Sequence, residues 1–137
     1  MSNPVPGRIV AGHGRFAHQL IEAIELILGA PSDLRPFDFQ LDETAEQAGR
    51  RLQRLVRELD GGAGVLIMAD LFGGTPGSLA LSLVKPGAVE VVTGVNLAMA
   101  LTACELAAGV SLREAADLVE NAGRSGITSA SGLSGGA

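Results

Sequence analysis

An uninterrupted apolar run, Gly-Val-Leu-Ile-Met-Ala at residues 64–69, is the feature of this sequence that most constrains its fold. A strand with one face in water alternates apolar and polar residues, whereas a strand buried on both faces is apolar throughout. Sheets that are buried on both faces have parallel strands and are covered by helices. The run therefore predicts an interior strand of a parallel sheet.

The segments around this run alternate between strand patterns and helix patterns. We expect further strands at residues 8–11, 35–39 and 89–93, and helices at 16–28, 44–59, 78–84, 97–108 and 111–122. The alternation predicts an α/β fold with three layers, in which helices cover both faces of a mostly parallel sheet. We expect a last short strand to begin near Ile127.

The length of 137 residues favours a single domain, which we place at residues 1–128. Residues 129–137 are mostly Gly, Ser and Ala, and we expect them to form a flexible tail. The start of the chain lacks the apolar segment of a signal peptide, and no apolar run approaches the ~20 residues that span a bilayer. We therefore expect a cytoplasmic protein.

Charge and cysteine content exclude several classes of function. The formal net charge is −5 and Lys85 is the only lysine, which argues against the basic surface that nucleic-acid binding requires. Because Cys104 is the only cysteine, the chain has neither an intrachain disulfide nor a zinc site built from cysteines. We expect no metal and no organic cofactor.

Three loops follow the predicted strands, at residues 12–14, 70–76 and 93–96. In an open α/β sheet, ligands bind outside the carboxyl ends of the strands, at the point where the strand order reverses. With the usual reversal the first and third strands are neighbours, so His13 and Asp70 would face each other across one crevice. His18, within the first helix pattern, is expected at the helix surface or boundary.

His13 has the surroundings that a phosphorylated histidine needs. It lies between Gly12 and Gly14 at a strand-to-helix turn, where the next helix offers free N–H groups. Asp70 can hold the other ring nitrogen, which fixes the tautomer and raises nucleophilicity. Hydrogen bonds to the phosphoryl oxygens are expected from residues of two loops: Gly14, Gly73, Gly74 and the Thr75 hydroxyl.

The same turn also matches a dinucleotide-binding pattern. Residues 12–17 read G-x-G-x-x-A after a strand, and Asp38 follows at the end of the next predicted strand. A dinucleotide-binding module is therefore an alternative function. The chain is short for that fold with a substrate site, and the pattern leaves the Asp70 loop unexplained. No Walker phosphate loop is present.

Three motifs occur in the order of a known family: Ile-Val-Ala-Gly-His-Gly-Arg-Phe-Ala at 9–17, Asp-Leu-Phe-Gly-Gly-Thr-Pro at 70–76 and Gly-Val-Asn-Leu-Ala-Met at 94–99. Together they resemble the mannose-family EIIA components of the bacterial phosphoenolpyruvate:sugar phosphotransferase system (PTS). The resemblance spans about residues 8–127. It implies a four-stranded sheet of order 2-1-3-4, with a C-terminal strand exchanged between the subunits of a homodimer.

The resemblance also implies roles and partners. His13 would accept a phosphoryl group from phospho-HPr and pass it to an EIIB component, with membrane contact only indirectly, through EIIC and EIID. Asp70 would orient His13, and Thr75 would help to bind the phosphoryl group. We assign partner docking to Arg15, Phe72 and Asn96. A regulatory protein that signals by its phosphorylation state, without sugar uptake, is a further alternative.

Overall fold

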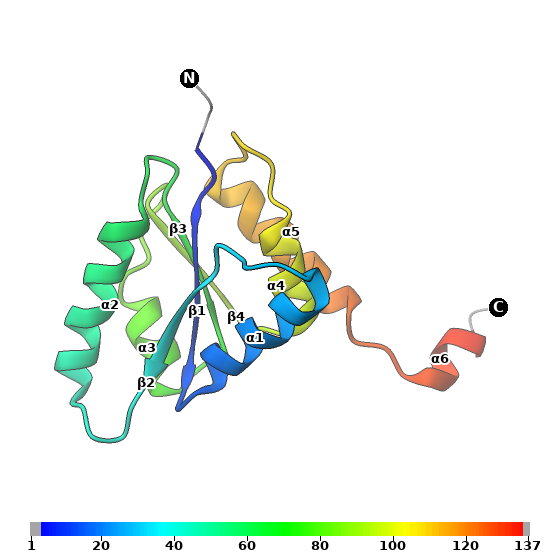
Figure 1. Cartoon of the computed structure of the whole chain (residues 1–137), viewed down its shortest axis with the longest axis horizontal. Coiled ribbons are helices and arrows are strands. Elements are labelled where there is room, and N and C mark those ends of the chain that lie inside the picture. The colour runs from blue at the N-terminus through cyan, green and yellow to red at the C-terminus, as the bar shows by residue number, and fades with distance from the viewer. Residues whose placement is uncertain (1–3, 136–137) are drawn as a thin grey trace.

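The apolar run forms β3 (Val65–Ala69), which is buried at every residue and lies inside a four-stranded sheet. The computed structural model describes residues 4–135 (Figure 1). In it, β3 pairs with β1 (Gly7–His13) on one side and with β4 (Val89–Thr93) on the other, and β1 also pairs with β2 (Arg35–Phe39). All three pairings are parallel, so the predicted α/β fold and the order β2-β1-β3-β4 are confirmed.

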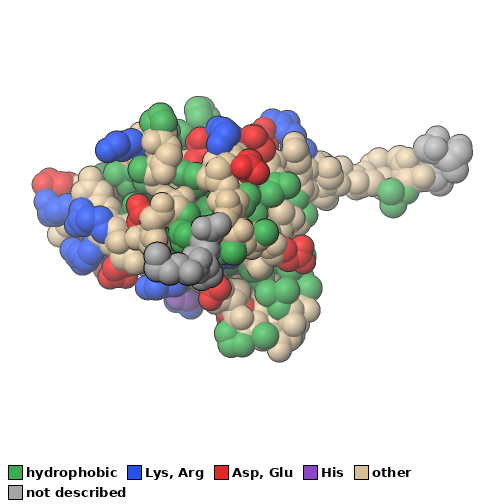
Figure 2. Space-filling model, turned by 90° about the horizontal axis from the view of Figure 1, so that it is seen from above, with side chains coloured by type: hydrophobic (Ala, Val, Ile, Leu, Met, Phe, Trp, Pro, Cys, Tyr) green, Lys and Arg blue, Asp and Glu red, His purple; other side chains and the backbone are tan. Residues whose placement is uncertain are grey.

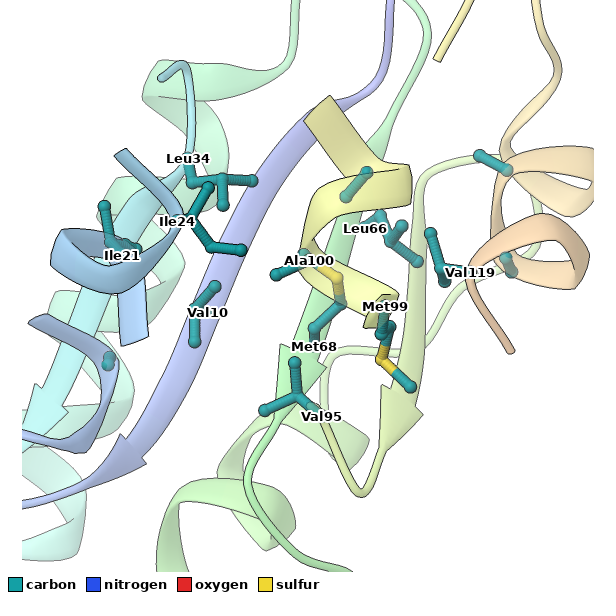
Figure 3. Packing of buried hydrophobic residues seen from close by; sticks show 14 of the residues in the cluster. Val10, Ile21, Ile24, Leu34, Leu66, Met68, Val95, Met99, Ala100 and Val119 are labelled. Atoms are coloured by element: carbon teal, nitrogen blue, oxygen red, sulfur yellow. The ribbon is translucent and has the colours of Figure 1, made fainter. Parts of the chain in front are cut away.

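Helices cover both faces of the sheet, as Figure 1 shows. Alternate residues of β1 and β3 point to opposite faces, and each face has its own core. One core joins Val10 and Leu66 to α1, α4 and α5 (Figure 3), and the other joins Ile9 and Ile67 to α2 and α3. The helix bounds are α1 Phe16–Leu28, α2 Ala45–Leu59, α3 Thr75–Leu81, α4 Leu97–Cys104, α5 Leu112–Ser125 and α6 Ala130–Gly135.

Local signals explain where two of these helices begin and end. α1 stops at Gly29, whose φ of 73° is left-handed and whose N–H donates to the Glu25 carbonyl. α2 begins after Thr44, which forms a capping box with Gln47. Both boundaries agree with the sequence prediction.

The bounds of three other helices differ from the prediction; α3, for example, ends at Leu81 rather than at residue 84. α3 begins at Thr75 rather than Ser78, because Pro76 fits the first turn of a helix, where no N–H is needed. α4 ends at Cys104 instead of residue 108, and α5 continues to Ser125. The thiol of Cys104 packs against a core, and burial raises its pKa. No helix within residues 4–135 is long and apolar enough to cross a membrane.

The expected strand near Ile127 does not form in the described part of the chain, and no antiparallel strand joins the sheet there. The N–H groups of Gly126 and Ile127 instead donate to carbonyls of the last turn of α5, so they are not available to a neighbouring strand. Part of the predicted tail forms α6, which projects from the body of the molecule (Figures 1 and 2). Residues 1–3 and 136–137, at the ends of the predicted domain and tail, lie outside the described residues.

Candidate functional site

His13 ends β1 and is held by the neighbouring strand. It pairs in register with Phe39, the last residue of β2, and the Gly14 N–H donates to the Phe39 carbonyl over 3.0 Å. Gly14 has a φ of 55°, a left-handed conformation that favours glycine and lets the chain turn from β1 into α1. The His13 side chain is 49% exposed, so a partner can reach the ring.

Asp70, the first residue after β3, binds the His13 ring as the sequence predicts. Its Oδ2 lies 2.7 Å from Nδ1 of His13 and also accepts the backbone N–H of His13 over 3.0 Å. The Asp70 N–H donates to the Ala11 carbonyl, which fixes the carboxylate at the end of the two central strands. Because a carboxylate accepts hydrogen bonds, Nδ1 is the ring atom that donates, and Nε2 retains a lone pair.

The glycine loop after Asp70 lies against the other edge of the ring. A Cβ built on Gly74 would be 2.6 Å from Cε1 and 3.1 Å from Nε2 of His13, closer than side chains approach. Gly73 has a φ of 96°, and Thr75 follows at the start of α3. The loop thus brings Gly74, next to Thr75, up to the free nitrogen of the ring.

A cavity of about 480 Å³ opens beside His13. Gly14 borders it on one side, and the segment that joins β2 to α2 borders it on the other, through residues 39–42. Leu41 in this segment is fully exposed. Sequence reasoning missed these residues, although the order of strands places the end of β2 next to the end of β1.

The residues assigned to partner docking lie in different surroundings. Phe72 is 71% exposed in the loop after Asp70, and Arg15 is exposed at the start of α1, where it borders a cavity with His18. The Asn96 side chain is used inside the chain: it accepts the Met99 N–H and donates to the Gly123 carbonyl, which joins α4 to α5.

A second histidine–aspartate pair lies nearby. Nδ1 of the exposed His18 is 2.5 Å from Oδ2 of Asp38, which is buried. The Asp38 carboxylate therefore has a partner within the chain instead of being free for the ribose of a dinucleotide. Within residues 4–135, no three His, Cys, Asp or Glu side chains are grouped so that they could hold a metal ion.

Comparisons of the sequence with known proteins identify one family. The family model described as "PTS system fructose IIA component" (EIIA-man) matches residues 7–120. The sorbose-specific EIIA component of the PTS from Lacticaseibacillus casei is 35% identical over 96 residues, which are 68% of this chain and 67% of that protein. The mannose-specific EIIAB component of Escherichia coli is 33% identical over 92 residues, 66% of this chain but only 28% of that longer protein.

A solved structure agrees with these sequence relatives. The mannose/sorbose specific IIA subunit of the phosphotransferase system from Enterococcus faecalis superposes with a TM-score of 0.80 at 29% identity. The match covers 91% of this chain and 94% of that one. The similarity thus includes the whole sheet and both helical layers.

Proposed function

This chain belongs to the mannose-family EIIA components of the PTS, and we propose that it carries a phosphoryl group on His13. The group comes from phospho-HPr and passes to an EIIB component in the cytoplasm, for sugar uptake. The observation that carries this proposal is the 2.7 Å contact between Asp70 Oδ2 and His13 Nδ1, which leaves Nε2 as the nucleophile. The phosphotransfer domain is residues 1–128, and residues 129–137 form its tail.

In each transfer one phosphorus–nitrogen bond breaks and another forms. The Nε2 lone pair attacks phosphorus as the bond to the donor histidine breaks, and the second transfer reverses this step toward EIIB. His13 then carries a proton on Nδ1 beside the phosphorylated Nε2, and the Asp70 carboxylate stabilises that positive charge. The backbone N–H groups of Gly73 and Gly74 and the Thr75 hydroxyl bind the phosphoryl oxygens. The N–H of Gly14, for which the sequence also predicts this role, donates to the Phe39 carbonyl instead.

Incubation with phosphoenolpyruvate, enzyme I and HPr tests the proposal directly. We expect mass analysis of the intact chain to show one added phosphoryl group that is lost in acid and kept in alkali, as is characteristic of phosphohistidine. An unmodified chain beside fully phosphorylated HPr would contradict the proposal. Exposed Phe72 and Arg15 lie on the surface that HPr and EIIB would contact.

The Gly74→Ala variant is expected to transfer the phosphoryl group at least ~10-fold more slowly, because the new Cβ would displace the His13 ring. Gly61→Ala is the matched control for an added Cβ, since Gly61 lies outside the site, has no left-handed φ and would place a Cβ with no atom within 4 Å. Thermal unfolding of both variants is measured alongside, so that loss of the fold can be recognised as a cause of a lower rate. Single-turnover transfer from phospho-HPr gives the rates. An unchanged rate in Gly74→Ala would mean that phosphoryl transfer does not depend on the close contact between Gly74 and the His13 ring.

We also propose that the protein is a homodimer. β4 is an edge strand of a parallel sheet, and a groove of about 420 Å³ runs beside it, with Val92 and Ile127 in its wall. An unpaired edge of this kind favours association with another chain. Light scattering should give about twice the chain mass of 13.9 kDa, whereas a mass of one chain would refute the dimer.

The same measurement on a chain that ends at Ser125 tests strand exchange. This shortened chain keeps α5 complete and removes α6 together with the segment around Ile127 that was expected to form the exchanged strand. If residues 126–137 cross to the partner, the shortened chain should dissociate. A shortened chain that stays dimeric would support the proposed dimer but would exclude strand exchange through these residues.

A further inference from the structure

His18 and Asp38 repeat the atomic arrangement of His13 and Asp70. In both pairs Nδ1 of a half-exposed imidazole lies against Oδ2 of an aspartate that is about nine-tenths buried. In both aspartates Oδ1 is buried without a hydrogen-bond partner among the described residues. His18 is thus the one described side chain that hydrogen-bonds to the buried Asp38 carboxylate.

The surroundings of the two imidazoles differ, however, and those of His18 do not suit a phosphoryl group. The cavity next to His18 includes the acidic side chain of Glu43, which opposes the phosphoryl dianion and does not border the cavity beside His13. Arg51, in the same cavity, is hydrogen-bonded to Glu43 and lowers the pKa of that carboxyl. Nothing in this cavity corresponds to the glycine loop that touches His13.

The backbone connects the two pairs instead. Asp38 directly precedes Phe39, whose carbonyl accepts the Gly14 N–H and so fixes the turn that carries His13. His18 lies in the first turn of α1, the helix that leaves this turn. The N-cap residue of α1, Arg15, makes no side-chain hydrogen bond to the helix, so α1 lacks the usual support at this end.

We propose that His18 is a positioning residue for phosphoryl transfer, which fastens the first turn of α1 to the end of β2 and so holds His13 against Asp70. This inference rests on the proposed function. Without His18, the Asp38 carboxylate is a buried charge with no side-chain partner in the described chain, and it must move toward water. That movement displaces the Phe39 carbonyl, then Gly14, and finally the His13 ring.

Transfer kinetics with three variants test the inference. We expect His18→Ala to lower the single-turnover rate at saturating phospho-HPr about 10-fold, the usual cost of losing a group that orients a reacting one. The final extent of labelling should not change. His18→Asn, whose amide can donate from about the position of Nδ1, should restore most of the rate. Gln19→Ala alters the next exposed residue of α1, whose side chain makes no hydrogen bond among the described residues, and it should transfer like the unaltered protein.

Nitrogen NMR of the ¹⁵N-histidine-labelled protein gives a readout that needs no phosphoryl donor. In the unaltered protein and in Gln19→Ala, the His13 ring should show one tautomer with the proton on Nδ1. In His18→Ala the signals should shift toward a mixture of tautomers, and in His18→Asn they should return. Because this result does not depend on HPr, it separates failure of the positioning role from failure of the proposed function.

Two results would overturn the inference. The first is a His18→Ala protein with the transfer rate and His13 signals of Gln19→Ala, which would make the His18–Asp38 pair a local contact only. The second is a phosphoryl label on His18 in a His13→Ala protein, which would make His18 an acceptor.

Discussion

Replacement of His13 by alanine should abolish phosphoryl labelling of this chain altogether. Among the described residues, the imidazole of His13 supplies the one nucleophilic nitrogen that lies between the Asp70 carboxylate and the glycine loop. Alanine has no atom that could form the phosphorus–nitrogen bond. The measurement is mass analysis after incubation with phosphoenolpyruvate, enzyme I and HPr, and we expect the mass of the unmodified variant.

His18→Ala is the matched control, since it removes the other histidine of the chain. It should reach one phosphoryl group per chain, only more slowly. Full labelling of the His13→Ala protein would place the acceptor elsewhere and refute the proposed site. A His13→Ala protein that melts at the temperature of the unaltered chain excludes unfolding as the reason for a lost label.

Replacement of Asp70 by alanine should slow transfer by ~10²–10⁴-fold, the usual range for a group that orients or assists a reacting imidazole. Without Oδ2 the His13 ring loses the acceptor for Nδ1 and for the backbone N–H of the same residue. The ring can then rotate and exchange tautomers. Single-turnover transfer from phospho-HPr measures the loss.

Asp70→Asn separates orientation from charge in the same assay. Its amide oxygen can still accept the hydrogen bond from Nδ1, but it cannot neutralise the positive ring of phosphohistidine. We therefore expect a rate between those of Asp70→Ala and the unaltered chain. A folded Asp70→Ala protein that transfers at the normal rate would show that the pairing with His13 has no part in the chemistry.

The sequence predicted the sheet and the contact between His13 and Asp70 because both depend on strong local signals. The apolar run of β3, with strand and helix patterns alternating around it, favours an interior strand of a parallel sheet, and the residues that follow parallel strands meet at one edge. Strand order then places Asp70 beside His13, with no need to know any side-chain conformation.

The sequence could not predict features that depend on contacts between distant segments. His18 and Asp38 are 20 residues apart, and neither belongs to a motif that requires the other. Ile127 has a strand pattern, but the end of α5 uses the N–H groups of this segment, and a tertiary contact of that kind overrides local preference. From the sequence, Asn96 is a loop residue that could contact a partner protein. Its hydrogen bond to the Gly123 carbonyl depends on the packing of α5, which the sequence pattern does not show.

The attachment of the site to β1 and β3 has a consequence for the timescale on which the protein works. Amide protons between the buried residues of β1 and β3 exchange with solvent only when the whole domain opens, so the spacing between the His13 and Asp70 backbones persists as long as the fold does. Such a site needs no lid and no induced closure. Under the proposed function, turnover is then governed by how quickly one partner protein leaves the exposed His13 ring and the next one arrives.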